Sequence, residues 1–364
     1  MKRRDFVAGM GVGAVGALVG CEQPTVDAQK TAASTEPPRK WKMVTTWPNN
    51  FPGLGTGATF LAETITKMTG GRISVTLYGA GELVPPFEVF DAVANGTAQI
   101  GHAGAYYWKG KAQATQLFGA VPFGMNATEM TGWLYHGGGM ELWRDVYRRF
   151  GLVPALAGHT GVQMGGWFNR EIQSVDDLRG LKMRIPGLGG EVFRRAGGLP
   201  VNRPGGELFN ALQTGDIDAT EWVGPSNDLA FGLYKAAKYY YYPGWHEPNA
   251  ALEAMFNKEA YDALPDDLKS CVMTACAAAA AHMLAEYTAT NPRALKTLIE
   301  EHGVQLRPFP RAVIERLKTL TTEVLDEIAA SDDEFATVLA SYRGFLASAR
   351  AWHDISDRAY YDLR

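Results

Sequence analysis

The sequence predicts an α/β protein with two related domains and a helical carboxyl-terminal region. Strand and helix patterns alternate over residues 41–101, and the same order returns over residues 181–220. Residues 90–101 (FDAVANGTAQIG) align without a gap with residues 209–220 (FNALQTGDIDAT), with identical Phe, Ala and Gly positions. We therefore expect two domains with mostly parallel sheets, flanking helices and right-handed crossovers. A chance similarity between two unrelated βαβ segments is the alternative.

Each copy of the pattern has three strands and two helices. Period-two alternation indicates a strand, a 3.6-residue period indicates an amphipathic helix, and Gly ends a helix. In the first copy we expect strands over 41–47, Ile73–Tyr78 and 98–101, a helix over 57–69 ended by Gly70-Gly71, and a helix over Phe87–Asn95 capped by Gly96. In the second copy we expect strands over 181–185, 200–202 and 217–220, a short helix over 190–196, and a helix over 207–214 capped by Gly215.

After Pro243 the sequence becomes mainly helical. The expected helices cover 259–261, 265–288, 310–330 and 333–360. Long Ala-rich helices of this kind bridge domains or form homodimers, and the sequence alone does not choose between these roles. The domain assignment is 41–162 for domain 1 together with part of 245–290, 163–244 for domain 2, and 245–364 for the helical segments.

The amino-terminal segment is predicted to be an export signal. Three basic residues precede a 14-residue apolar run over Phe6–Val19, which is shorter than the roughly 20 residues that span a bilayer. Arg3-Arg4 resembles a twin-arginine signal, and Leu18-Val19-Gly20-Cys21 resembles a lipobox, so 1–20 would be removed and Cys21 lipidated. An ordinary signal peptide with a chance cysteine is the alternative. Residues 21–40 are expected to form a flexible linker.

The composition excludes several classes of protein. Of 364 residues 46% are hydrophobic and 20% are charged, which excludes a disordered chain. A net charge of −4 argues against nucleic-acid binding, and loss of 1–20 makes the charge −6. Cys271 and Cys276 lie about 140° apart on a predicted helix, which excludes a disulfide between them and favours buried free thiols.

Charged residues follow three of the predicted strands. Arg184 interrupts the apolar strand predicted over 181–185, just before Pro186-Gly187, so its guanidinium could bind a carboxylate in a bidentate fork or form a structural salt bridge. Glu221 follows the strand over 217–220, and Glu247 follows a Tyr-rich strand. These carboxylates could bind a hard cation, form an acid–base pair of the glycosidase type, or pair with lysine.

Aromatic side chains and glycine-rich loops accompany these charges. The aromatic residues near strand ends are Tyr106, Tyr107, Trp108, Trp167, Trp222 and Trp245, with core packing as the alternative. The loops over 53–57 and 187–190 do not match GxGxxG, so they favour approach of a small anion to a helix N-terminus over a dinucleotide site. GxSxG, P-loop, HExxH and CxxC motifs are absent from the sequence.

Three segments resemble a known family. GVQMGGWFNREI (161–172), LRGLKMRIPGLGGEVFRRAGG (178–198) and IDATEWVGPSNDLAFGLYKAAKYYYYPGWHEPNA (217–250) resemble the DctP-type solute receptors of tripartite ATP-independent periplasmic (TRAP) transporters. The last segment resembles the branch that binds 2-oxo acids or lactate with a metal ion. The resemblance implies a two-domain periplasmic binding-protein-like fold that closes on its ligand by hinge bending.

The resemblance also assigns roles to individual residues. It implies that Arg184 clamps the substrate carboxylate and that Tyr106 and Tyr107 contact the substrate from the other domain. The residues implied to hold the cation are Gln163, Glu221, Glu247 and Trp222 through its main chain; Gln163 and Trp222 are also expected beside the substrate. His159 stands where the resemblance predicts Asn, and a histidine there would make specificity pH-sensitive.

The implied function is a receptor in the periplasm, not an enzyme. It would capture a small 2-oxo or 2-hydroxy monocarboxylate with Na⁺ or Ca²⁺ and deliver it to the small and large membrane subunits of a permease. A divalent ion would leave the site neutral, but the sequence does not decide between the two ions. The alternatives are a secreted metal-assisted lyase or hydrolase that uses Glu221 and Glu247, and a receptor that reports the same ligand to a sensor protein.

Overall fold

The computed structural model describes residues 37–364. The predicted export signal, Cys21 and residues 21–36 of the predicted linker lie outside these residues. The first strand begins at Arg39, close to the expected start at Trp41.

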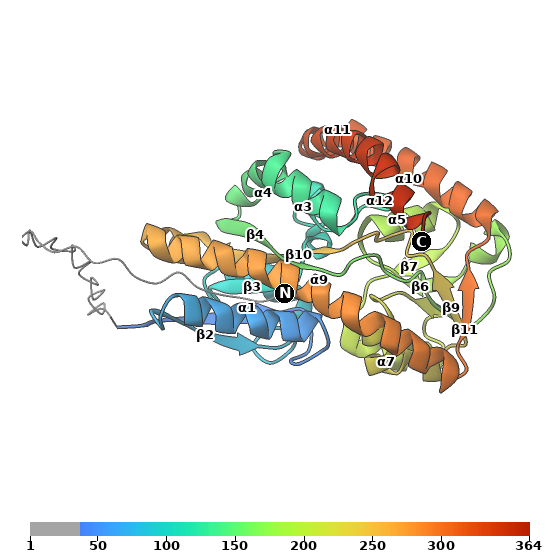
Figure 1. Cartoon of the computed structure of the whole chain (residues 1–364), viewed down its shortest axis with the longest axis horizontal. Coiled ribbons are helices and arrows are strands. Elements are labelled where there is room, and N and C mark those ends of the chain that lie inside the picture. Colours follow the sequence, from blue (N-terminus) through green and yellow to red (C-terminus); the bar gives the residue numbers. More distant parts are fainter. Residues whose placement is uncertain (1–36) are drawn as a thin grey trace, which may run out of the picture. The chain divides into compact units, whose positions relative to one another are not determined.

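Five strands form the first sheet (Figure 1). We call the part of the molecule built around this sheet the first lobe. Their order is β2 (Ile73–Tyr78), β1 (Arg39–Thr45), β3 (Ile100–Gly104), β10 (Ala251–Asn257) and β4 (Leu152–His159). The β2, β1 and β3 strands are parallel, whereas β10 is antiparallel to both of its neighbours.

Six strands form the second sheet, and we call the part of the molecule built around it the second lobe. Their order is β11 (Gln305–Pro308), β9 (Tyr239–Tyr242), β5 (Gly166–Phe168), β8 (Ala219–Thr220), β6 (Lys182–Arg184) and β7 (Leu199–Val201). The β5 strand is antiparallel to β8 and β9, and the other pairs are parallel. Each sheet is mostly parallel, as expected, with one reversed strand, β10 in the first and β5 in the second. Each reversed strand follows a segment in which the chain crosses from one sheet to the other.

The internal repeat corresponds to matching structure in the two lobes. Helix α2 (Val89–Ala94) follows a 3₁₀ turn and ends near Gly96, and α6 (Leu208–Thr214) also follows a 3₁₀ turn and ends at Gly215. Both glycines have positive φ, 80° and 75°, which explains why the repeat keeps Gly there. The other helices of the two lobes are α1 (Leu54–Met68), α3 (Ala127–His136), α4 (Gly139–Arg148), α5 (Gly187–Arg195), α7 (Pro225–Phe231) and α8 (Lys258–Asp262).

Helix α9 (Asp266–Glu300) runs along both lobes, from beside α1 to beside α7 (Figure 1). Its first half buries Val272 and Cys276 in the first lobe, and its second half buries Tyr287 and Leu298 against the second lobe. By length and composition α9 could cross a membrane; in this fold one face of the helix is buried against both lobes. The prediction that it ends at Thr288 is wrong: it continues through Pro292, because its apolar face still buries Ala294 and Leu298 beyond the proline.

Two long helices complete the fold. Helix α10 (Arg311–Ser331) packs on the second lobe through Val313, Leu317, Leu320 and Val324. Helix α11 (Asp333–Ile355) returns to the first lobe through Phe335, Val338, Leu339, Tyr342 and Leu346. The helix expected over 333–360 is interrupted at Ser356 and resumes as α12 (Asp357–Tyr361). Cys271 and Cys276 are both free; Cys276 is buried as expected, whereas Cys271 is half-buried.

Candidate ligand and ion site

Two chain segments that connect the lobes run side by side. Residues 160–165 connect β4 to β5, and residues 243–250 connect β9 to β10. Their backbones are hydrogen-bonded to each other: Thr160 N to Ala250 O (3.1 Å), Gln163 N to Glu247 O (3.3 Å) and Gly244 N to Gln163 O (2.8 Å). We call 160–165 and 243–250 the crossing segments. They bring Gln163 and Glu247 together although 83 residues separate them in the sequence.

Arg184 and Glu221 meet at the ends of two adjacent parallel strands. Arg184 ends β6 and pairs in register with Thr220 of β8, so Glu221 follows directly beside it. The two side chains are 1% exposed and form a buried ion pair through Nη1 and Oε1. Arg184 also donates from Nε to the Arg203 carbonyl (3.1 Å) and from Nη2 to the Tyr107 hydroxyl (3.3 Å).

Glu221 of this ion pair also belongs to a cluster of side chains that can ligate a metal. Ligand atoms of Glu221, His246 and Glu247 lie within 4.8 Å of one another, and all three residues are buried. Gln163 Nε2 donates to Glu247 Oε2 (2.7 Å), and Gln163 Oε1 has no hydrogen-bond partner among residues 37–364. Burial and the nearby Glu221 raise the pKa of Glu247 well above its ordinary value. A cation favours the charged form of such a carboxyl, so two carboxylates and an unpartnered amide oxygen fit a hard cation.

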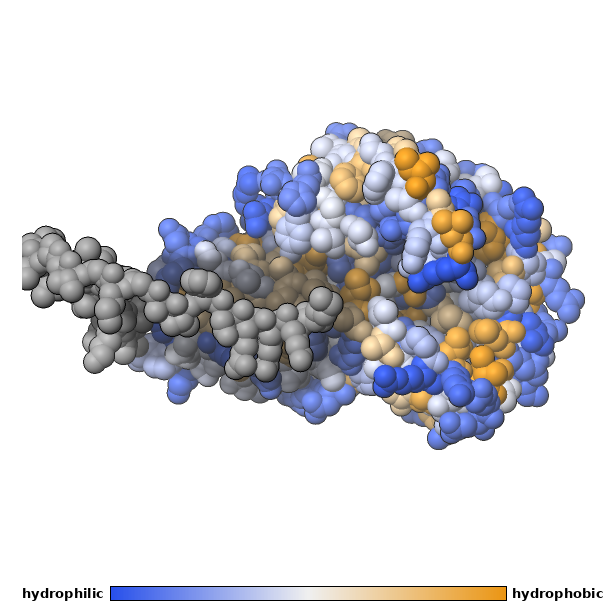
Figure 2. Space-filling view, viewed as in Figure 1, coloured by the Kyte–Doolittle hydropathy of each residue, from blue (hydrophilic) through white to orange (hydrophobic). Residues whose placement is uncertain are grey.

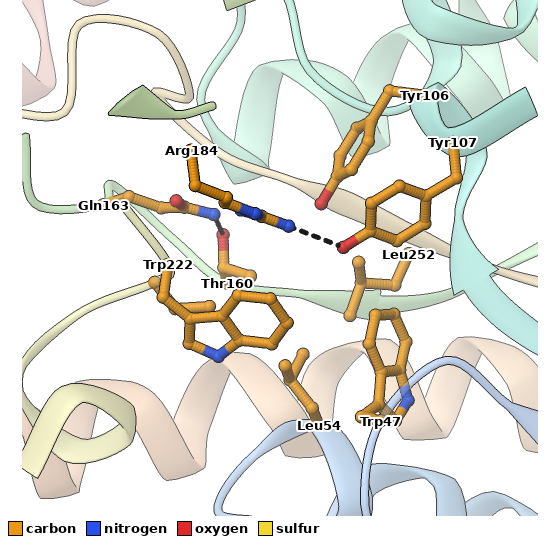
Figure 3. A pocket seen from close by; sticks show the side chains of 10 residues that line it. Trp47, Leu54, Tyr106, Tyr107, Thr160, Gln163, Arg184, Trp222 and Leu252 are labelled. Carbon is orange, nitrogen blue, oxygen red and sulfur yellow. Dashed lines mark hydrogen bonds between the residues drawn. The ribbon is translucent and has the colours of Figure 1, made fainter. Parts of the chain in front are cut away.

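A small pocket lies beside the cluster (Figure 3). Its polar side has Arg184, Gln163, Thr160 and the hydroxyl of Tyr107, while Trp47, Leu54 and Leu252 form an apolar side. The Arg184 guanidinium lies 4.9 Å from the ring centroid of Trp222. This arrangement can hold one carboxylate at the guanidinium and a short apolar group opposite it.

The predicted tyrosines reach this pocket from the first lobe. Tyr106 and Tyr107 lie in the 3₁₀ helix Ala105–Trp108, directly after β3, and both line the pocket. Burial raises the pKa of both hydroxyls, so both side chains keep their hydrogen and can donate it. The three remaining aromatic candidates pack in the cores: Trp108 bonds Glu253, Trp167 stacks on Tyr240, and Trp245 packs with Phe123.

His159 lies beside the pocket and is not among the residues that line it. Its Nε2 is 2.8 Å from the Thr131 hydroxyl, and its Nδ1 is 3.0 Å from Asn249 Nδ2. Burial lowers its pKa to about 4, so the ring is neutral at physiological pH. This disagrees with the expectation that His159 makes specificity pH-sensitive near neutrality.

The two glycine-rich loops differ in what lies against them. The backbone N–H of Gly53 donates to the Glu286 carboxylate of α9 (2.9 Å), so the anion at the start of α1 is a side chain of the protein itself. At the start of α5, Gly187 has a φ of 59°, and a Cβ there would lie 3.1 Å from Tyr106 Cβ. Glycine therefore lets the two lobes approach closely at this point.

Several residues of the site were not predicted. Trp47, Leu54, Val223 and Leu252 line the pocket, and His246 joins the carboxylate cluster. The apolar residues carry no sequence signal that separates them from the core. One sequence feature could have indicated His246: it directly precedes Glu247 in the segment that follows the Tyr-rich strand.

Comparisons with known proteins identify the family. Residues 43–332 match the model of the DctP family, described as bacterial extracellular solute-binding protein, family 7. The chain belongs to this family. This DctP-type chain is therefore a solute receptor of a TRAP transporter, and the predictions of the family, of a receptor rather than an enzyme, and of an α/β fold with long carboxyl-terminal helices are confirmed. Receptors of this family act in the periplasm with membrane permease subunits.

Several known proteins are similar to this DctP-type receptor over nearly their whole length. A monocarboxylate 2-oxoacid-binding periplasmic protein of Nostoc sp. is 40% identical over 361 residues, 99% of this chain and 98% of its own. A TRAP periplasmic solute-binding protein of Pseudoalteromonas atlantica, solved with bound sodium and pyruvate, is 43% identical with a TM-score of 0.87 and covers 90% of this chain and 99% of its own. A similar protein of Colwellia psychrerythraea, solved with bound calcium and pyruvate, is 43% identical with a TM-score of 0.88 and covers 90% of this chain and 100% of its own.

Proposed function

We propose that this receptor captures a small 2-oxo or 2-hydroxy monocarboxylate, such as pyruvate, 2-oxobutyrate or lactate, together with Na⁺ or Ca²⁺. The observation that carries the proposal is the position of Arg184 and Gln163 in one small pocket, beside the buried carboxylates of Glu221 and Glu247. Two similar receptors hold pyruvate with sodium or calcium, and the Nostoc relative is named for 2-oxo acids, which supports this ligand class.

Arg184 is suited to bind the carboxylate of the ligand. A guanidinium has five N–H donors, and three of its hydrogen bonds go to Glu221, Tyr107 and Arg203. Because the group is buried and stacked near Trp222, a ligand carboxylate meets a fixed charge in a low-dielectric environment. Tyr106 and Tyr107 add hydroxyl donors from the first lobe.

Gln163, Glu221, Glu247 and the main chain of Trp222 would hold the ion. When bound, the ion supplies a positive charge that polarises the 2-oxo or 2-hydroxy oxygen of the ligand. The fold positions these ligands. The paired crossing segments place Gln163 beside Glu247, and the end of β8 places Glu221 beside Arg184. We further propose that the two lobes close on the ligand about the crossing segments, with domain bounds near those expected from the sequence.

Binding measurements with the purified receptor test this function. We expect Arg184→Ala to abolish detectable binding of 2-oxo and 2-hydroxy monocarboxylates in calorimetry, because an ionic clamp is lost from a buried site. Arg179→Ala, which changes an exposed arginine with a side chain 76% exposed, is the control and should bind like the unchanged protein. Retained micromolar affinity in Arg184→Ala would contradict the clamp.

The ion can be tested separately. We expect removal of Na⁺ and Ca²⁺ to weaken monocarboxylate binding, and Glu247→Gln to weaken it even when the ions are present. The reason is that the substitution replaces one carboxylate donor of the cluster by a neutral amide. Binding that is indifferent to every ion would overturn the ion part of the proposal and leave the Arg184 clamp in place.

We also propose that the receptor forms a homodimer through its carboxyl-terminal helices. Trp352 (63% exposed) and Ile355 (74% exposed) lie three residues apart on α11, and Tyr360, Tyr361 and Leu363 follow with exposures above 60%. Figure 2 shows one face of the molecule, which is mostly hydrophilic with a few separate hydrophobic groups. Five exposed apolar or aromatic side chains within residues 352–363 favour a protein interface there.

For export, we propose a twin-arginine signal over 1–20 and lipidation of Cys21. This proposal rests on the sequence motifs alone. Mass spectrometry of the exported protein would show a diacylglyceryl-modified Cys21 at the mature amino terminus, and an unmodified mature chain would contradict it.

A further inference from the structure

His246 is a buried histidine of the carboxylate cluster. It belongs to the crossing segment 243–250, is 1% exposed, and its Nε2 lies 3.3 Å from Oε2 of Glu221. Its other ring nitrogen, Nδ1, has no hydrogen-bond partner in the described part of the chain. The contact with Glu221 is therefore the polar contact that orients the ring.

The hydrogen bond has one possible direction. A carboxylate only accepts, so Nε2 carries the hydrogen and donates it to Glu221. Arg184 donates to the other oxygen, Oε1. Both oxygens of Glu221 thus accept hydrogen bonds: Oε1 from Arg184 of strand β6, and Oε2 from His246 of the crossing segment 243–250.

The position of the His246 side chain is fixed by packing as well. A Cβ added to Gly189 of α5 would lie 2.9 Å from His246 Cβ, so this glycine leaves the space that His246 fills. The Trp245 ring stands at 71° to the imidazole, with ring centroids 5.6 Å apart. An imidazole held in this way can hold a carboxylate in one orientation.

We infer that His246 is a positioning residue for the ion and the ligand: its Nε2–H fixes the carboxylate of Glu221 in the orientation that binds the cation. This inference rests on the proposed function of the site. A free glutamate side chain loses rotamer freedom when it binds an ion, and His246 removes that freedom in advance. Hydrogen-bond partners of metal ligands commonly change metal affinity by about 10- to 100-fold, which sets the expected size of the effect.

Three substitutions at this position separate a hydrogen bond from mere packing. In His246→Gln the amide Nε2 can reach the position of the imidazole Nε2, whereas in His246→Asn the amide reaches only the position of Nδ1. His246→Leu fills space without a donor. His136→Gln, a change of an exposed histidine in α3, is the control.

The measurements are calorimetric titration with Ca²⁺ alone, titration with pyruvate at saturating Ca²⁺, and thermal unfolding without either. We expect His246→Leu and His246→Asn to weaken Ca²⁺ binding about 10- to 100-fold, and His246→Gln to stay within about threefold of the unchanged protein. Pyruvate affinity should recover in all variants once Ca²⁺ is saturating. The unfolding temperatures of the variants, measured without ligand, should not rank in the same order as their Ca²⁺ affinities.

Several results would overturn the inference. If His246→Leu binds Ca²⁺ like the control, or if His246→Gln is as weak as His246→Leu, the Nε2–H donor does not position Glu221. If Ca²⁺ affinity falls only in proportion to the loss of thermal stability, the role is structural. The unchanged receptor is titrated first, and if it binds Na⁺ rather than Ca²⁺ the same comparison is made with Na⁺. A failure of the unchanged receptor with both ions and with pyruvate, 2-oxobutyrate and lactate would instead overturn the proposed function.

Discussion

Glu253 shows how a single residue can link stability to pH without contacting the ligand pocket. It lies on β10 with 0% exposure, and both its carboxylate oxygens accept hydrogen bonds, from Trp108 Nε1 (2.5 Å) and from the Tyr147 hydroxyl (2.7 Å). Burial raises its pKa from the ordinary 4.5 to about 7, more than these two hydrogen bonds lower it. Between about pH 4.5 and pH 7 the Glu253 carboxyl is therefore protonated in the folded protein and ionised in the unfolded chain.

This shift predicts how stability changes with pH. The contribution of Glu253 is fully present below about pH 4.5 and is lost as the pH rises through about 7, with a size of up to about 3 kcal/mol. We expect Glu253→Gln to raise the free energy of unfolding at pH 8 and to flatten its pH dependence between pH 5 and 8, because the amide is neutral throughout. Denaturant unfolding across this range measures both effects.

The control for this prediction is Glu82→Gln, a change of an exposed carboxyl outside the cores. A pH dependence that is the same in Glu253→Gln and in the unchanged receptor would contradict the raised pKa. Asp228, whose pKa burial raises to about 7 as well, adds a dependence of the same sign, so part of the slope should remain in Glu253→Gln.

At the scale of elements, local patterns predicted most helices and strands, and long-range contacts determined the rest. The helix capped by Gly215 and the strand beside Arg184 follow from periodicity and from glycine at positive φ. Helix α9 passes through Pro292 because tertiary packing outweighs the lost backbone hydrogen bond. The antiparallel strands β5 and β10 depend on where the chain crosses between sheets, which no local pattern reports.

The same distinction holds for the site. Arg184 and Glu221 could be placed together from the sequence, because ends of adjacent parallel strands meet at one edge of a sheet. Gln163 and Glu247 are neighbours only because the two crossing segments pair, so their assignment depended on the family resemblance. Trp47 and Leu54 look like any core residue in the sequence and become pocket residues only through the fold.

The end of α11 gives a prediction about assembly. We expect the double substitution Trp352→Ser and Ile355→Ser to convert the proposed dimer into a monomer in sedimentation equilibrium, because it removes the two most exposed apolar side chains of this helix. Leu199→Ser, which changes a 54% exposed side chain on the second lobe, should leave the dimer intact. A double variant that sediments like the unchanged receptor would place any dimer contact elsewhere.

At the scale of the whole molecule, α7 of the second lobe is bonded to a loop of the first lobe. Asn227 is 0% exposed, donates from Nδ2 to the Pro52 carbonyl (2.7 Å) and accepts from the Tyr287 hydroxyl of α9 (3.0 Å). Pro52 lies two residues before the pocket residue Leu54. The bond to Pro52 therefore exists only while the lobes stand in this arrangement.

We expect Asn227→Ala to release ligand faster than the unchanged receptor, by about tenfold, because loss of a buried bond between the lobes costs about 1–2 kcal/mol in the closed arrangement. Rapid filtration with labelled pyruvate measures the dissociation rate. Ser226→Ala is the matched control, since the Ser226 hydroxyl bonds Thr290 of α9 and not the first lobe. Equal rates for Asn227→Ala and Ser226→Ala would show that this bond does not hold the lobes together.

The two indoles of the pocket give the receptor an optical signal of its own. Trp47 and Trp222 line the same pocket, and Trp222 lies under the guanidinium of Arg184. A ligand carboxylate that pairs with Arg184 changes the electric field at Trp222. An apolar group of the ligand in the pocket changes the surroundings of Trp47. The intrinsic tryptophan emission of the unlabelled protein should therefore change when a ligand binds, and the change should be smaller in variants that lack Trp47 or Trp222.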